Sequence, residues 1–105
     1  MPPKQAVKLI SNASGYLLQG SLNYDSITDL IPLKISQIDA TTVSVDCAGL
    51  ERIDSAGIAL LIQWQRECES HHKKLLLLNL PSQATSLLKA NQLTDFFQTS
   101  DKALL

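Results

Sequence analysis

The sequence predicts a single α/β domain with a mixed four-stranded sheet, in the element order β-β-α-β-α-β-α. The chain has 105 residues, of which 45% are hydrophobic and 18% charged, so it can bury one real core. Turn-forming residues separate the first two apolar segments, which predicts an antiparallel hairpin. Each of the last two strands follows a helical pattern, which predicts parallel pairing through right-handed crossovers. We therefore expect residues 1–105 to form one domain.

The first three elements are two strands and a helix. Residues 7–10 and 16–22 have the composition of strands, and the sequence SNASG joins them. Apolar residues then recur at helical spacing, at Ile27, Leu30, Ile31, Ile35 and Ile38. Pro32 is compatible with a helix only in its first turn, where the missing N–H costs nothing. The regular helix is therefore predicted from about Asp29, with residues 24–28 as its lead-in.

A strand and a strongly apolar helix form the centre of the chain. Residues 42–47 alternate polar and apolar side chains, with the period of a strand. Residues 55–69 are predicted to form a helix that is apolar over most of its circumference at the start, and such a helix should be largely covered. The sequence HHKK at 71–74 places cations where they suit a helix C-terminus.

The remaining elements are a buried strand, a short helix and a packed tail. Residues 75–78 are four consecutive leucines, as expected of an interior strand covered on both faces. Ser82 is predicted to cap a helix that buries Ala84, Leu87 and Leu88, and Asn91 is a suitable C-terminal stop. Three apolar residues beyond it are expected to pack back on the body, namely Leu93, Phe96 and Phe97.

Composition disfavours several classes of function. The formal net charge is -1 and no long basic run is present, so nucleic acid is not an expected partner. Cys47 and Cys68 lack a C-x-x-C spacing and fall on apolar faces, which favours buried free thiols in a reducing compartment. No apolar run approaches the ~20 residues that span a bilayer, and no signal peptide is visible. We expect a cytoplasmic protein without direct membrane insertion.

The junction between the central strand and helix, residues 53–57 (IDSAG), is the strongest functional signal. Ser55 is predicted to be the N-cap of the helix, because its hydroxyl can accept a hydrogen bond from a backbone N–H two or three residues on. Free N–H groups and the helix dipole favour an oxygen acceptor or anion there. Ala56 and Gly57 have little or no side chain to project from the surface beside Ser55, so another macromolecule can approach closely. The alternative is a well-capped core helix without further function.

The order of elements, with DSAG at a strand–loop–helix junction, resembles the STAS family. Those are the domains of anti-sigma factor antagonists and of the cytoplasmic ends of sulfate transporters. The resemblance runs from the first hairpin through the third helix and is sharpest over residues 45–50 and 53–61. It implies a STAS-type fold, and a role in signalling members for phosphorylation of the serine that aligns with Ser55.

Within the family the chain is similar to the small STAS subunits of bacterial Mla phospholipid ABC transporters. The shared features are the short length, LIPL at residues 30–33, Trp64 followed by a basic turn and an apolar strand, and NLP at residues 79–81. This branch implies a non-enzymatic accessory subunit that binds and regulates the transporter's ATPase, peripheral to the inner membrane through its partners. The alternative is an anti-sigma factor antagonist, in which an anti-sigma factor kinase phosphorylates Ser55.

The resemblance gives Ser55 two possible roles, as a phosphoacceptor or as a partner contact. Asp54 is either a secondary cap or a partner-facing carboxylate. Asp25 and Ser26 precede the first helix, and the STAS fold brings that loop close to Ser55, so both join the expected interface. The alternative for Asp25, which the sequence favours slightly, is a solvated loop residue.

Ala56, Gly57 and Trp64 are also candidate partner contacts. Gly57 has a structural role as well, since it is expected to allow close packing at the first helical turn. Trp64 is either a core residue or an interface hot spot, since partner surfaces are enriched in tryptophan.

No catalytic, metal or cofactor site is predicted. Ser55 has no histidine at a suggestive spacing, and the two histidines, His71 and His72, follow the far end of its helix. Because these histidines are adjacent, their side chains splay apart, with no carboxylate or cysteine at ligand spacing. Asp46 precedes a short glycine-containing segment that lacks the length and the lysine of a phosphate-binding loop.

Overall fold

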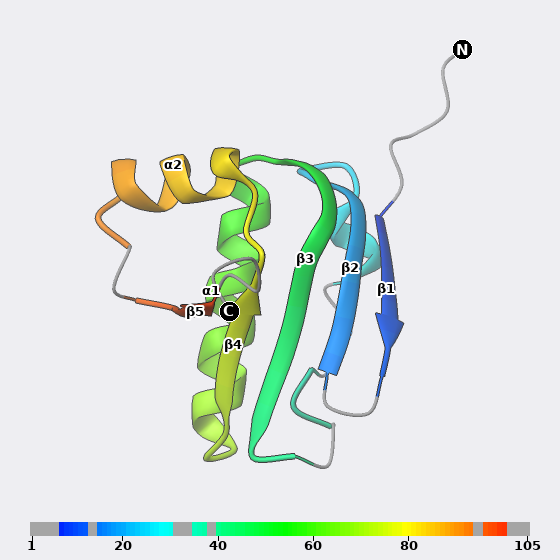
Figure 1. The fold of residues 1–105 in the computed structure, drawn as a ribbon, viewed down its shortest axis with the longest axis vertical. Coiled ribbons are helices and arrows are strands. Elements are labelled where there is room, and N and C mark those ends of the chain that lie inside the picture. The colour runs from blue at the N-terminus through cyan, green and yellow to red at the C-terminus, as the bar shows by residue number, and fades with distance from the viewer. Residues whose placement is uncertain (1–6, 13–14, 31–34, 38–39, 94–95, 101–105) are drawn as a thin grey trace.

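In the computed structural model the chain forms a mixed five-stranded sheet with strand order β1-β2-β3-β4-β5 (Figure 1). The structure describes residues 7–12, 15–30, 35–37, 40–93 and 96–100. The strands are β1 (Val7–Ser11), β2 (Gly15–Leu22), β3 (Thr42–Ile53), β4 (Lys74–Leu78) and β5 (Gln98–Ser100). The helices are α1 (Ser55–Ser70) and α2 (Ser82–Ala90), with two short 3-10 helices, η1 (Ile27–Asp29) and η2 (Ile35–Gln37).

Strand pairing confirms the predicted topology. β1 and β2 form the antiparallel hairpin, and β3 and β4 join the sheet in parallel. The three-residue strand β5 was not predicted; it extends the sheet by pairing parallel with β4. Since the carboxyl ends of β2 and β3 lie side by side, the turn after β2 and the start of α1 meet at one end of the molecule.

The core lies between one face of the sheet and α1, which runs behind β4 in Figure 1. Val43, Val45 and Cys47 point to this face and are buried, whereas Ser44 and Asp46 on the other face are half-buried. From α1 the core receives Gly57, Ile58, Leu60, Leu61, Trp64 and Cys68. Trp64 is only 1% exposed, so it is a core residue and not a surface hot spot.

Strand β3 is longer than predicted. It has 12 residues and continues beyond residue 47, where the predicted strand ended, to Ile53. Its register with β2 shifts between Leu17 and Gln19 and again between Gly20 and Ser21. The two strands nevertheless remain paired beyond these irregular positions. The extension carries β3 to Ile53, opposite Leu22 at the end of β2.

The first predicted helix is not continuous over the described residues. They form the 3-10 helices η1 and η2, and residues 31–34 and 38–39 lie outside the description, including Ile31, Pro32, Leu33 and Ile38. Two properties of the sequence disfavour a regular α-helix here. Pro32 cannot donate a backbone hydrogen bond, and four isoleucines are restricted at χ1 by β-branching.

The prediction that Ser82 caps α2 is wrong. The N-cap is Pro81, which makes no side-chain cap hydrogen bond, and Ser82 is the first helical residue. Asn91 is the C-cap, as predicted. Beyond it, Phe97 is buried and Leu93 is half-buried against the core, whereas Phe96 is 36% exposed.

Both cysteines are buried free thiols, as predicted. Burial, with a smaller contribution from the charge of Asp46, raises the pKa of Cys47 to about 12. Burial and the charge of Glu67 raise the pKa of Cys68 to about 11, although Lys73 acts in the opposite direction. Neither thiol therefore has the thiolate character that a reactive cysteine needs. Among the described residues no helix is long and apolar enough to cross a membrane.

Candidate functional site

Asp54, and not Ser55, is the N-cap of α1. Asp54 has an extended backbone (φ -118°, ψ -172°), and its Oδ1 accepts a hydrogen bond of 3.1 Å from the Gly57 N–H. Aspartate and serine are both good N-cap residues. Because β3 ends at Ile53 and α1 begins at Ser55, Asp54 is the residue that lies between them and caps the helix. Ser55 is therefore the first helical residue, with its hydroxyl available for other contacts.

The second carboxylate oxygen of Asp54 ties the turn after β2 to the start of α1. Oδ2 accepts a hydrogen bond of 3.2 Å from the Tyr24 N–H, and the Asp54 N–H donates to the Leu22 carbonyl at 3.2 Å. The expected proximity of the Asp25 segment and Ser55 is thus confirmed. Asp54 caps α1 and holds the turn after β2 against it, and Asp54 is itself exposed at the surface.

The turn itself is held by its own side chains. Asn23 Oδ1 accepts from the N–H groups of Asp25 and Ser26 at 3.0 and 3.1 Å. Ser26 is fully buried, and its hydroxyl donates to the Ser21 carbonyl at 2.6 Å and accepts from the Asn23 N–H at 3.0 Å. The expectation that Ser26 contacts a partner is therefore wrong, since its side chain fixes the turn from inside.

Gly57 allows α1 to approach β2 and β3 closely, as predicted. A Cβ at this position would lie 2.6 Å from the Leu22 carbonyl oxygen and 2.7 Å from Ile53 Cγ1. Gly57 is buried, so it cannot itself be a partner contact, and Ala56 is half-buried beside it. The main role of these two small residues is therefore to let the start of α1, which carries Ser55, lie close to the sheet.

Three exposed residues surround the junction. Ser55 and Asp25 are both exposed, and no hydrogen bond within the described part of the chain engages the Ser55 hydroxyl. Tyr24 is 76% exposed, although large aromatic side chains usually pack inside. Tyr24 was not predicted as a site residue, although an aromatic side chain within the otherwise polar turn NYDS was a signal for it. We call Tyr24, Asp25, Asp54 and Ser55 the Ser55 surface.

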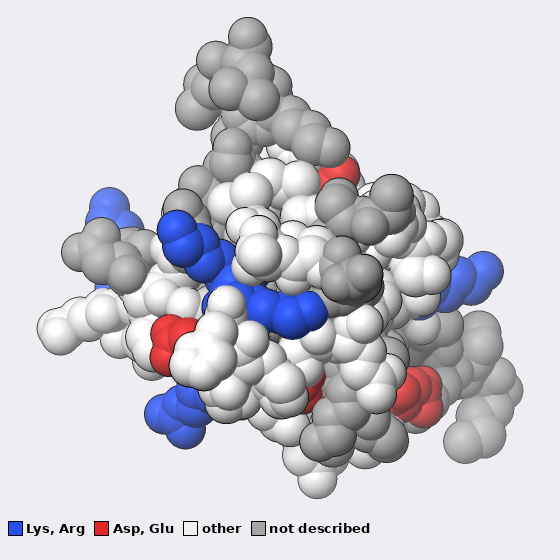
Figure 2. Space-filling model, turned by 90° about the horizontal axis from the view of Figure 1, so that it is seen from below, with Lys and Arg blue, Asp and Glu red and all other residues white. Residues whose placement is uncertain are grey.

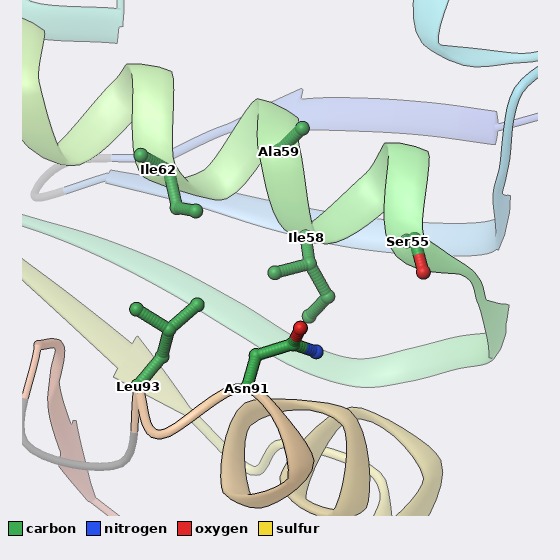
Figure 3. Close-up of a pocket in the computed structure, with 6 residues that line it drawn as sticks. All are labelled: Ser55, Ile58, Ala59, Ile62, Asn91 and Leu93. Atoms are coloured by element: carbon green, nitrogen blue, oxygen red, sulfur yellow. The ribbon is translucent and has the colours of Figure 1, made fainter.

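A shallow, mainly apolar groove continues from Ser55 along α1. It has a volume of about 160 Å³ and is lined by Ser55, Ile58, Ala59, Ile62, Asn91 and Leu93. Figure 3 shows Ile58, Asn91 and Leu93 pointing into the space between α1 and the segment after α2, with Ser55 at one end. The groove is thus polar near Ser55 and Asn91 and aliphatic toward Ile62.

The chemistry of the surface is suited to binding. Asp25, Asp29 and Asp54 are exposed acidic residues of the turn, η1 and the α1 cap, which favours a partner with basic groups. Within the described ranges, no group of three or more histidine, cysteine, aspartate or glutamate side chains is placed to hold a metal ion. Ser55 and the groove offer a hydrogen bond and an apolar contact, respectively.

Comparison with known proteins identifies the family. Residues 15–99 match the family model described as "Mlab, STAS domain". The chain belongs to the STAS domain family. This STAS domain is also 36% identical over 64 residues to the intermembrane phospholipid transport system binding protein MlaB of Haemophilus influenzae. The match spans 61% of this chain and 61% of that relative.

Two solved structures show the same fold. The anti-sigma factor antagonist SpoIIAA in its unphosphorylated form has a TM-score of 0.64 and 20% identity, covering 90% of this chain and 87% of that one. The Bacillus cell fate determinant SpoIIAA in its phosphorylated form has a TM-score of 0.61 and 20% identity, covering 92% and 93%. At this identity the likeness establishes the STAS fold alone.

Proposed function

We propose that this STAS domain is a non-enzymatic accessory subunit of an Mla-type phospholipid transporter, and that it binds the transporter's cytoplasmic ATPase through the Ser55 surface and the adjoining groove. The chain would then be cytoplasmic and peripheral to the inner membrane through its partner complex. The relation to the Haemophilus influenzae phospholipid transport protein supports the transporter assignment.

The observation that carries the proposed interface is the exposed Ser55 hydroxyl on a rigid support. Asp54 holds the turn and the helix together, and buried Gly57 fixes the distance of α1 from the sheet. A partner therefore meets a preorganised surface, which reduces the entropy lost on binding. Exposed Tyr24 on one side and the apolar groove on the other supply contacts of the kind that contribute most binding energy.

Ser55→Glu tests this interface. At the interface the longer side chain would replace the Ser55 hydroxyl contact, and its carboxylate would lie close to the like charge of Asp54, so affinity should fall at least tenfold, or about 1.4 kcal/mol. The measurement is isothermal titration of the purified chain with the purified ATPase subunit.

Ser82→Glu is the matched control, because Ser82 is likewise an exposed first residue of a helix. It adds the same charge at the same helical position of α2 and should leave the affinity unchanged. Equal affinity of wild type and Ser55→Glu would remove Ser55 from the interface.

The second candidate function is a phosphorylation switch, as in an anti-sigma factor antagonist. The exposed hydroxyl of Ser55 in the first turn of α1 favours it, because a helix N-terminus tolerates the charge of about -1.5 to -2 that phosphate adds. Incubation with a cognate kinase and ATP should then raise the intact mass by one phosphate, and Ser55→Ala should prevent the increase. An unmodified wild-type protein would exclude the switch.

A further inference from the structure

Within the Ser55 surface, Asp54 is bound through both carboxylate oxygens to the backbone of its own chain. Oδ1 accepts from the Gly57 N–H at 3.1 Å, inside the first turn of α1. Oδ2 accepts from the Tyr24 N–H at 3.2 Å, and so joins two segments that lie 30 residues apart in sequence. The Asp54 N–H donates to the Leu22 carbonyl at 3.2 Å, which anchors Asp54 itself at the end of β2.

The turn after β2 has hydrogen bonds of its own that do not involve Asp54. The side chains of Asn23 and Ser26 close the turn through hydrogen bonds to the backbone of residues 21–26. These bonds set the conformation of the turn, but they do not set its distance from α1. The bond from the Tyr24 N–H to Asp54 acts on that distance, because Asp54 also caps the helix.

Tyr24 is the residue of the turn that Asp54 holds. Its side chain is 76% exposed, so little packing within the chain fixes the ring, and the fold controls this residue through its backbone. An aromatic ring on a backbone that is already in place loses less entropy when a partner covers it. Tyrosine is also enriched among the residues that contribute most to binding energy at interfaces.

We propose that Asp54 is a positioning residue of the binding surface, which contributes to partner binding by holding Tyr24 at the start of α1 and not through its own charge. This role rests on the proposed function, because it requires that Tyr24 contact the transporter ATPase. It replaces the partner-facing carboxylate that the sequence allowed for Asp54, since both carboxylate oxygens serve backbone N–H groups of the chain itself.

Asp54→Asn removes one acceptor and leaves the helix capped. The amide oxygen can still accept from the Gly57 N–H, since asparagine is as good an N-cap as aspartate, but the amide NH2 group cannot accept from the Tyr24 N–H. Asp25→Asn is the matched control, because Asp25 is exposed in the same turn and loses the same charge. The bond of Asp25 to Asn23 comes from its backbone N–H, which the substitution leaves in place.

The first readout is the exchange of backbone amide protons with water in the free protein, followed by NMR. Asp54→Asn should speed exchange at Tyr24 about tenfold, as expected when a hydrogen bond to a charged group is lost, and should leave Gly57 unchanged. Asp25→Asn should leave both amides near their wild-type rates. The His72 amide, which donates to the Glu69 carbonyl at 3.0 Å, is the internal reference. It lies beyond the far end of α1, and Figure 2 views the molecule from that end.

The second readout is a double-mutant cycle of Asp54→Asn and Tyr24→Ala, measured as affinity for the purified ATPase subunit. Asp54→Asn should weaken binding about fivefold in the wild-type background and have almost no further effect in the Tyr24→Ala background, because Asp54 acts through Tyr24. A contact made by the Asp54 charge itself would instead lower the affinity equally in both backgrounds. Asp54→Ser, which keeps a capping oxygen and lacks the second acceptor, serves if Asp54→Asn does not fold.

The outcomes separate this role from the proposed function. Wild-type exchange at Tyr24 in Asp54→Asn, or additive losses in the cycle, would overturn the positioning role and leave the interface standing. Full affinity of Tyr24→Ala would overturn it as well. Full affinity of both Tyr24→Ala and Ser55→Glu would contradict the proposed interface itself.

Discussion

Gly57 sets the distance between α1 and β2. Replacing it with alanine sets two effects against each other: the better helix propensity of alanine and the steric clash of its Cβ. Alanine is favoured over glycine inside a helix by about 1 kcal/mol, yet here the new Cβ would meet the Leu22 carbonyl oxygen at 2.6 Å. Overpacking typically costs about 1–3 kcal/mol, so Gly57→Ala should lower the free energy of unfolding in urea. Gly49→Ala is the control, since its Cβ would meet the Gln19 side chain, which can move.

Cys47 should make stability fall at alkaline pH. Burial raises its pKa from 9.0 to about 12, so the folded state keeps the thiol proton while the unfolded state loses it. Its contribution to stability is therefore complete below pH 9 and is lost as the pH rises toward 12. At about 1.4 kcal/mol per pH unit, the stability of wild type relative to Cys47→Ala should fall by about 2 kcal/mol between pH 8 and pH 10.5. Parallel pH profiles of urea unfolding for the two proteins would contradict this account.

At the residue scale, the sequence predicted which residues meet at the candidate site, but it did not predict their individual structural roles. The DSAG junction pointed to Ser55 because a serine at a helix start either caps the helix or offers its hydroxyl to a partner. Asp54 and Ser55 are both good caps, so only the end of β3 could decide which one caps. Asp25 and Ser26 are neighbouring polar residues of one turn, and the sequence does not indicate which of them is exposed. In the structure Ser26 is buried and donates to the Ser21 carbonyl, whereas Asp25 is exposed.

At the element scale, the exposed stripe of α1 should govern binding without governing stability. Ala59 is exposed and borders the groove one turn after Ser55, so Ala59→Arg would place a long cation at its edge. We expect a change in unfolding free energy within about 0.5 kcal/mol, as is usual for surface substitutions, together with at least tenfold weaker ATPase binding. Ser86→Arg on the exposed side of α2 should change neither. Unaltered affinity for Ala59→Arg would mean that the groove lies outside the interface.

Elements with strong periodicity were predicted well, and elements defined by pairing were not. The hairpin and α1 follow from local patterns, and α1 was predicted to within one residue at its end. The extension of β3 through Ala48 and Gly49 depends on pairing with β2, and β5 depends on an available edge of β4. Such contacts join residues far apart in sequence, so local patterns carry no signal for them.

At the scale of the whole molecule, α1 separates two surfaces of different character. Its 16 residues span about 24 Å at 1.5 Å per residue. The Ser55 surface lies at one end, and a hollow lined by Ala40, Thr41, His71, His72 and Lys73 lies at the other. Family membership was predictable because the DSAG junction and the element order occur together. The hollow was not, since it requires Thr41 and His72 to meet.

Photo-crosslinking from position 24 in native cells tests the central claim most directly. Tyr24 is exposed and aromatic, so a photoreactive benzoylphenylalanine should replace it without disturbing the fold. We predict a crosslinked product that contains the transporter ATPase, and no such product from the same residue at exposed Ile10 on β1. Equal crosslinking to the ATPase from both positions, or a serine kinase in its place at position 24, would contradict the proposed interface.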